Sequence, residues 1–241
     1  MIVLEGAVNF RDLGGYATTD GRRTRWRVLF RADGLGELTE PDLDIMRELG
    51  IRTVVDLRSG YEVESSRFDT DAHPVAFHHT PFIDELPHPE EFERQPGFLG
   101  TFYKDMLEDA SLQIVKALDA LTAPEAQPAV FHCTAGKDRT GLLAALVLSL
   151  VGVPEETVVR DYALSGEAMA RLRAKLILKY PDGKEAIENA TEAFSVEPDH
   201  MVALLAHLRE RDGSVEAYAA RIGVADAVVA LLRQQLLEPA P

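Results

Sequence analysis

The chain has 241 residues, of which 46% are hydrophobic and 27% charged, so it is long and apolar enough for a globular core and is not a disordered chain. Its formal net charge of -15 at pH 7 disfavours nucleic acids and anionic membrane surfaces as partners. A single cysteine, Cys133, excludes an internal disulfide and a cysteine-rich zinc site.

The first 60 residues predict short strands and one helix. The segment at residues 25–31 predicts a strand. Thr39 is expected to cap a helix that ends at Gly50. The apolar run at 51–57 then predicts a buried strand that ends in a polar pair.

Residues 61–110 are strongly acidic, with 12 acidic and 3 basic residues, and so carry nine of the fifteen excess negative charges. Four prolines within residues 81–98 predict an irregular loop, the kind of segment in which mobile functional side chains are often found. Asp84 lies in this predicted loop.

The second half of the chain predicts a strand and many helices. A helix is expected over 112–121, a short apolar strand over 129–132 and an apolar helix over 141–150. Beyond residue 155 the pattern is helical, with segments at 160–179, 198–211, 214–221 and 225–237. We therefore predict an α/β fold in which a mostly parallel central sheet is flanked by helices. No long linker divides the chain, so residues 1–241 are expected to form one domain, with 155–238 as a helical addition.

The segment from Phe131 to Gly141 lies between the predicted strand and the apolar helix, and it contains Cys133. A strand–loop–helix turn directs backbone N–H groups and a helix N-terminus at the loop, which favours a thiolate and binds a tetrahedral dianion. Arg139 can hold two phosphate oxygens, Gly136 lets the loop bend, and the Thr140 hydroxyl can reach the sulfur. The residues expected to surround the phosphate are Thr134, Ala135, Gly136, Lys137, Asp138, Arg139 and Thr140.

Cys133 also has alternative interpretations. A lone cysteine is commonly an inert buried thiol, but the glycines and arginine at fixed spacing favour a nucleophile. A catalytically dead phosphate-binding module would keep the loop without the chemistry. A redox or sulfur-transfer enzyme on such a loop usually needs a second cysteine or a shorter loop, and this chain has neither.

The string His-Cys-x5-Arg-Thr-Gly resembles the signature of the cysteine-dependent protein tyrosine phosphatase superfamily. With Gly136-Lys137-Asp138 in the loop, the chain is similar to the bacterial tyrosine/dual-specificity and lipid phosphatases. Further similar blocks are Asn9-Phe10-Arg11-Asp12-Leu13-Gly14-Gly15, Leu29-Phe30-Arg31, Val55-Asp56-Leu57-Arg58-Ser59 and Asp161-Tyr162. The resemblance runs from about residue 8 to about residue 236. It implies the phosphatase fold and a lid within residues 160–200.

The resemblance implies hydrolysis of phosphotyrosine, with phosphoserine/threonine as further substrates and phosphoinositides as the alternative. Cys133 would attack phosphorus, and Arg139 with the loop amides would stabilise the charge that develops on the phosphoryl oxygens. Asp138 is the first candidate for the general acid, and Asp84 is the second. Lys137 would add positive charge at the mouth of the site, or it is an exposed lysine without a role in specificity.

Five residues in the similar segments are expected to support the loop: His132, Arg11, Asp12, Asp56 and Arg58. For the four other than His132, surface ion pairs are the alternative interpretation. No metal or cofactor is expected, because His73, His78, His79 and His88 lack regular ligand spacing. The expected partner is a phosphorylated protein or peptide, with no stable membrane anchor. The start of the chain lacks a signal-peptide pattern, which predicts a cytoplasmic protein and leaves secretion without a signal peptide open. The sequence does not indicate the oligomeric state.

Overall fold

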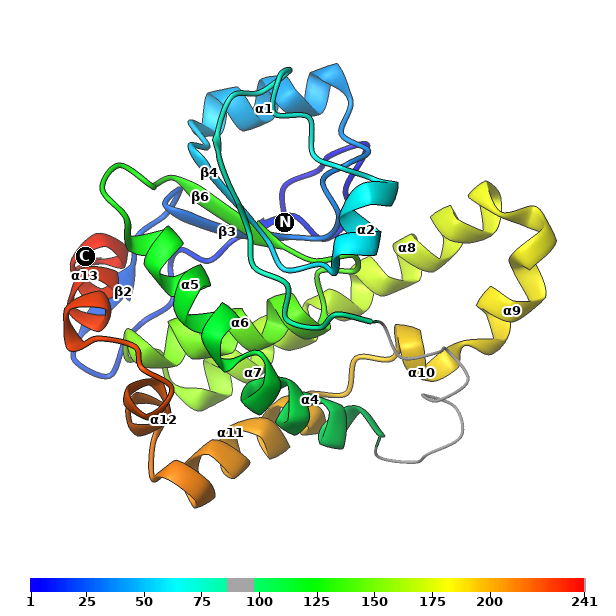
Figure 1. Cartoon of the computed structure of the whole chain (residues 1–241). Coiled ribbons are helices and arrows are strands. Elements are labelled where there is room, and N and C mark those ends of the chain that lie inside the picture. Colours follow the sequence, from blue (N-terminus) through cyan, green and yellow to red (C-terminus); the bar gives the residue numbers. More distant parts are fainter. Residues whose placement is uncertain (86–97, 241) are drawn as a thin grey trace.

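The computed structural model describes residues 1–85 and 98–240. Its five-stranded sheet has the order β1-β3-β6-β4-β5 (Figure 1). The strands are β1 (Arg11–Asp12), β3 (Leu29–Ala32), β6 (Ala129–His132), β4 (Thr53–Asp56) and β5 (Ala76–His79). All neighbouring pairs are parallel except β1 with β3. The mostly parallel sheet that the sequence predicts is therefore confirmed.

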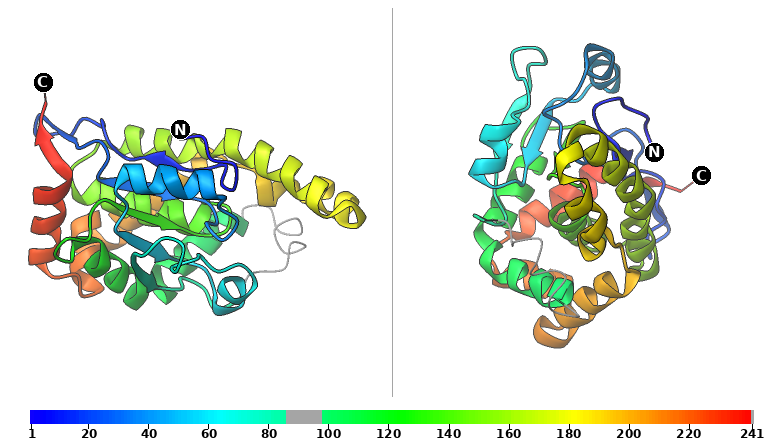
Figure 2. Two further views of the ribbon diagram at one scale, coloured as in Figure 1. Left: turned by 90° about the horizontal axis from the view of Figure 1, so that it is seen from above. Right: turned by 90° about the vertical axis from the view of Figure 1, so that its right-hand side faces the viewer.

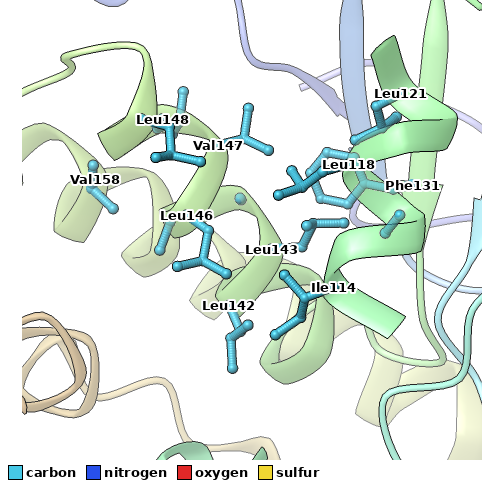
Figure 3. Packing of buried hydrophobic residues seen from close by; sticks show 14 of the residues in the cluster. Ile114, Leu118, Leu121, Phe131, Leu142, Leu143, Leu146, Val147, Leu148 and Val158 are labelled. Carbon is cyan, nitrogen blue, oxygen red and sulfur yellow. The ribbon is translucent and has the colours of Figure 1, made fainter. Parts of the chain in front are cut away.

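Alternating residues of the strands build two separate layers of core. Val130 of β6 packs in one cluster with Met46 of α1 (Glu40–Leu49). Phe131, the next residue, packs in a larger cluster with α5 (Ser111–Thr122) and α6 (Asp138–Leu150) on the opposite face (Figure 3). Because successive strand residues face opposite sides, a central strand that is apolar on both faces needs helices on both.

The remaining helices lie mainly after α6. They are α7 (Glu155–Ala163), α8 (Ser165–Lys179), α9 (Lys184–Asn189), α10 (Thr191–Phe194), α11 (Pro198–Asp212), α12 (Val215–Arg221) and α13 (Asp226–Leu236). Buried residues of α11, α12 and α13 belong to the same hydrophobic cluster as the sheet. A small second sheet pairs β2 (Arg22–Thr24) with β7 (Leu237–Pro239) and so joins the C-terminal strand to the N-terminal region. The far end of α8 and α9 project beyond the rest of the molecule (Figures 1 and 2).

Local signals predicted the first helix well. Thr39 and Asp42 form a capping box at the start of α1, and Gly50 ends the helix with a φ of 70°. The strand expected at 25–31 is wrong in its first half, since β3 begins at Leu29. Arg27 has a φ of 62°, and its N–H donates to Asp12, so the chain turns there instead of extending.

The continuous helix expected at 160–179 is also wrong. The chain forms two helices, α7 and α8, with Leu164 between them. The Arg11 side chain binds both the Asp161 carboxylate before the break and the Ser165 hydroxyl after it, which fixes this turn. The apolar helix expected from 141 begins three residues earlier, at Asp138.

The acidic stretch contains elements that the sequence did not predict: α2 (Gly60–Ser65), β5 and α4 (Phe98–Asp109). The predicted loop at 81–98 lies partly outside the described residues, as do Pro87, His88, Pro89 and Pro96. Within the described ranges, no helix is long and apolar enough to cross a bilayer.

Candidate active site

Cys133 follows β6 directly and stands at the carboxyl edge of the sheet, where β3 and β4 also end. Its side chain is buried, and residues 133–137 form the loop that leads into α6. Gly136 has a φ of 65°, and a Cβ at this position would lie 2.6 Å from the carbonyl oxygen of Ala32. Only glycine fits this close approach without moving the backbone of β3.

Buried donors bind the carbonyl groups of the Cys133 loop. We call the side of the loop that these carbonyls face the outer side, and the opposite side the inner side. The Asn9 amide donates to the carbonyls of Ala135 at 3.0 Å and Gly136 at 3.1 Å, and Arg31 donates to Gly136 at 2.8 Å. In a trans peptide the N–H points away from the C=O. Fixing these carbonyls outward therefore turns the N–H groups of Gly136 and Lys137 toward the inner side, as an anion-binding loop requires.

An ionic network stands behind these donors. Asp161 accepts from Arg31 at 2.6 Å and from Arg11 at 3.1 Å, and all three side chains are at most 3% exposed. Burial favours the neutral form of Asp161, but the two guanidinium groups outweigh it and lower the pKa of this carboxyl. Burial also lowers the pKa of Arg31, to about 10. Asp161 therefore stays ionised and locks the two arginines in place.

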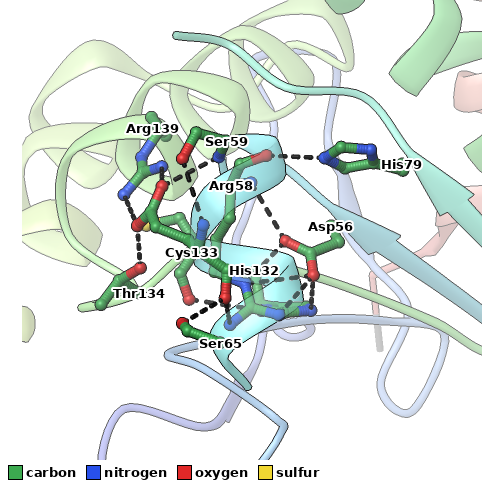
Figure 4. Close-up of polar contacts among 10 residues, drawn as sticks. Asp56, Arg58, Ser59, Ser65, His79, His132, Cys133, Thr134 and Arg139 are labelled. Carbon is green, nitrogen blue, oxygen red and sulfur yellow. Dashed lines mark hydrogen bonds and ion pairs between the residues drawn. The ribbon is translucent and has the colours of Figure 1, made fainter. Parts of the chain in front are cut away.

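Arg139 is held on the inner side by Glu62, which lies in the first turn of α2. The guanidinium donates to both carboxylate oxygens, at 2.6 and 2.9 Å, and the Thr134 hydroxyl donates to the same carboxylate (Figure 4). Although burial opposes ionisation, the bonds from Arg139 and Thr134 lower the pKa of Glu62 to about 2. Burial also opposes the charge of Arg139, but the electrostatic contributions of Cys133 and Glu62 raise its pKa. The planar fork is thus fixed beside the sulfur.

His132, Asp56 and Arg58 lie together at the base of the loop. Asp56 accepts from Arg58 at 2.7 Å, and its carboxylate lies 3.5 Å from His132 Nε2. Burial lowers the pKa of His132 despite the nearby carboxylate, so the imidazole is neutral at pH 7. His79 of β5 donates to the Arg58 carbonyl at 2.8 Å (Figure 4). The structure thus brings these three predicted supports together beneath Cys133.

The acid candidates lie in different surroundings. Asp138 is the first residue of α6 and accepts a hydrogen bond from the Tyr103 hydroxyl at 2.5 Å. Asp84 is exposed and lines a cavity of about 520 Å³ together with Asp105 and Asp109. Among the described residues that line this cavity, none belongs to the Cys133 loop.

Three other predicted site residues differ from expectation. The Lys137 ammonium is buried and donates to the carbonyls of Ala193 at 2.8 Å and Ser195 at 2.9 Å, so it does not stand free at the mouth. The Thr140 hydroxyl is buried and has no hydrogen-bond partner among the described residues, so the expected bond to sulfur is not formed. Asp12 accepts from the N–H groups of Gly14 and Arg27 and so holds a turn rather than the loop.

The structure also adds site residues that sequence reasoning did not single out: Asn9, Arg31, Asp161, Glu62 and Tyr103. The first three lie inside the similar blocks, but nothing in the sequence gave their partners. Glu62 follows Ser59 by three residues, which is the capping-box pattern that the structure forms. That pattern could have located the start of α2, although not the bond to Arg139.

No group of three His, Cys, Asp or Glu side chains arranged to hold a metal ion is found within residues 1–85 and 98–240. His73 instead packs edge-on against Phe68.

Comparison with known proteins identifies similar chains. A model of the family described as "Tyrosine phosphatase family" matches residues 2–238. A tyrosine-protein phosphatase of Nostoc commune is 30% identical over 231 residues, covering 86% of this chain and 73% of that protein. The triple specificity protein phosphatase PtpB of Mycobacterium tuberculosis is 29% identical, covering 97% of this chain and 98% of PtpB. Among solved structures, TpbA of Pseudomonas aeruginosa is 18% identical, with a TM-score of 0.41 and coverage of 84% of this chain and 90% of that one.

Proposed function

The chain belongs to the tyrosine phosphatase family, and on that premise we propose that Cys133 is the nucleophile of a two-step hydrolysis of phosphotyrosine. It is a protein-tyrosine phosphatase, a phosphoric monoester hydrolase. The observation that carries the site assignment is the loop itself. Cys133 is followed by backbone N–H groups turned inward and by a guanidinium that Glu62 fixes in one plane.

In the first step the Cys133 thiolate attacks phosphorus, the S–P bond forms and the ester P–O bond breaks. Arg139 and the loop amides stabilise the charge on the three non-bridging oxygens. The general acid protonates the leaving oxygen. In the second step water attacks phosphorus, the same carboxylate takes a proton from that water, and inorganic phosphate leaves as the S–P bond breaks.

Asp138 is the first candidate for this acid because it borders Arg139, and Asp84 remains the second. Asp138→Asn and Asp84→Asn should be compared on p-nitrophenyl phosphate, which has a good leaving group, and on phenyl phosphate, which has a poor one. Loss of the true acid lowers kcat by about 10²- to 10⁴-fold on phenyl phosphate and by less on the other ester. Equal losses on both esters would remove that residue from the role.

Cys133→Ser tests the nucleophile. We expect kcat on phenyl phosphate to fall by a factor on the order of 10⁶, the scale seen when a hydrolase loses its nucleophile. The thermal unfolding midpoint should stay close to that of the parent. Turnover retained by the variant would contradict the mechanism. Turnover by the parent chain separates the enzyme from a phosphate-binding module, which would bind phosphate but never hydrolyse an ester.

Among substrates, phosphotyrosine in proteins or peptides is the class we propose. Phosphoserine/threonine is proposed as a further activity, since the similar protein PtpB is a triple specificity protein phosphatase. Phosphoinositides are less well supported. The lysine that the resemblance links to them, Lys137, donates to two backbone carbonyls instead of standing free. Kinetics with matched phosphopeptides and soluble phosphoinositides would rank the classes.

We also propose that residues 160–200 cover the site within a single domain of residues 1–241, in which 155–238 form the helical addition. Two observations support this proposal. The Lys137 bonds join the Cys133 loop to the chain around the end of α10, at Ala193 and Ser195. The buried residues of α11, α12 and α13 share their hydrophobic cluster with the sheet.

A further inference from the structure

A fully buried phenol contacts the carboxylate of Asp138. Tyr103 lies on α4 and its hydroxyl donates to Asp138 Oδ1 at 2.5 Å. Burial and the negative charge of Asp138 raise the pKa of this phenol well above its ordinary value, so it keeps its proton at any pH at which the enzyme works. The direction of the hydrogen bond is therefore fixed, with the phenol as donor and the carboxylate as acceptor.

A second phenol holds the first. The Tyr162 hydroxyl of α7 lies 2.8 Å from the Tyr103 hydroxyl, and the two rings meet edge to face. Since the Tyr103 hydroxyl donates its only proton to Asp138, the Tyr162 hydroxyl is the donor in this contact. The Tyr162 ring also packs on the start of α6, where a Cβ on Gly141 would lie 3.0 Å from it. α4, α7 and α6 thus fix the Tyr103 oxygen from three sides.

The contacts of Asp138 are unevenly divided between its two oxygens. The Tyr103 hydroxyl and the Lys137 ammonium, at 3.5 Å, both approach Oδ1. A proton on Oδ1 would oppose the Tyr103 donor and the ammonium charge. The proton of the neutral carboxyl therefore belongs on Oδ2. A general acid needs this property, because the proton must sit on one defined oxygen and face the leaving group.

We propose that Tyr103 is a positioning residue that orients Asp138 so that Oδ2 delivers the proton to the leaving oxygen. The inference rests on the proposed function and adds to it a residue from a helix with no previously assigned role. In the first step the Oδ2–H bond breaks, the new O–H bond forms on the leaving group, and the carboxylate left behind is held by Tyr103. In the second step the proton taken from water returns to Oδ2.

The test is Tyr103→Phe, which removes one hydroxyl and keeps the ring. Because a hydrogen bond to a charged group contributes about 10-fold or more to an equilibrium, we expect kcat on phenyl phosphate to fall about 10-fold. On p-nitrophenyl phosphate kcat should fall less than about 3-fold, since a good leaving group needs little protonation. KM should stay unchanged on both esters, because the phosphate contacts are intact.

The matched control is Tyr218→Phe. Tyr218 is also fully buried, and its hydroxyl donates at 2.7 Å to the carbonyl of Leu107, away from Asp138. It should leave both esters unaffected while costing a similar amount of thermal stability. If Tyr103→Phe lowers kcat equally on both esters, or matches Tyr218→Phe, Tyr103 has only a structural role and the inference is overturned.

The double variant Tyr103→Phe/Asp138→Asn separates the inference from the proposed function. If Tyr103 acts through Asp138, adding its substitution to Asp138→Asn causes no further loss on phenyl phosphate. If Asp138→Asn depends on the leaving group and Tyr103→Phe does not, only the inference fails. If Cys133→Ser retains turnover, the proposed function and the inference both fail. Should Tyr103→Phe fold poorly, Tyr162→Phe is expected to give the same pattern with a smaller loss, and its absence would overturn the inference.

Discussion

The two sides of the Cys133 loop are held by different kinds of contact. On the outer side, Asp161, Arg11 and Arg31 form a network whose side chains are at most 3% exposed. On the inner side, Glu62 and Arg139 form a pair that is 8% and 6% exposed, and Asp138 is 22% exposed. The outer network fixes the shape of the loop, while the inner contacts position Arg139 and Asp138, the groups that we propose to meet the substrate. A substitution in the outer network should therefore lower stability and activity together, whereas a substitution of Arg139 should lower activity alone.

The largest effect on stability is expected for Asp161→Asn. It leaves Arg31 and Arg11 as buried charges without a carboxylate partner, and breaking such a pair costs about 3–5 kcal/mol. Chemical denaturation should show this loss, and activity should fall with it because the loop carbonyls lose their support. A variant that unfolds like the parent but has low activity would contradict the assignment of this network to stability.

Arg139→Lys should lower activity with little loss of stability. A lysine cannot donate to two phosphate oxygens in one plane, and the loss of such a donor costs about 10²- to 10³-fold in kcat. The positive charge beside Glu62 remains, so the free energy of unfolding should change little. Steady-state kinetics and denaturation on the same sample would check both parts. A loss of stability as large as that of Asp161→Asn would remove the distinction between the two sides.

A further test of the inner side is the pH dependence caused by Glu62. Its folded-state pKa of about 2 lies below the ordinary value of 4.5, so its contribution to stability is complete above about 4.5 and is lost as the pH falls toward about 2. Glu62→Gln lacks this titration. The difference in the free energy of unfolding between parent and variant should therefore shrink as the pH falls through this range. A constant difference from neutral pH down to about 2 would contradict the paired state of Glu62.

The same division explains what the sequence could predict. The Cys133 loop is encoded locally, since Gly136, Arg139 and the start of α6 follow one another within a few residues. The partners of that loop come from far along the chain. Glu62 is 77 residues from Arg139, and Tyr103 is 35 residues from Asp138. Spacing patterns report only neighbours along a strand or helix, so these contacts depend on how the sheet and helices pack.

Two local predictions failed for a related reason. The turn at Arg27 and the break at Leu164 both occur where a side chain from another segment, Asp12 or Arg11, binds the chain. Apolar spacing alone favoured a strand and a continuous helix at these places. By contrast, α1 depends on its own caps, Thr39 and Gly50, and was predicted closely.

The central claim is that Cys133 accepts the phosphoryl group. The most direct measurement is to quench the enzyme in acid during turnover of p-nitrophenyl phosphate and to map the phosphorylated peptide by mass spectrometry. We predict one phosphoryl group on Cys133, and none in Cys133→Ser treated in the same way. Steady turnover with no phosphoryl group on Cys133, or with the group on another residue, would contradict the account.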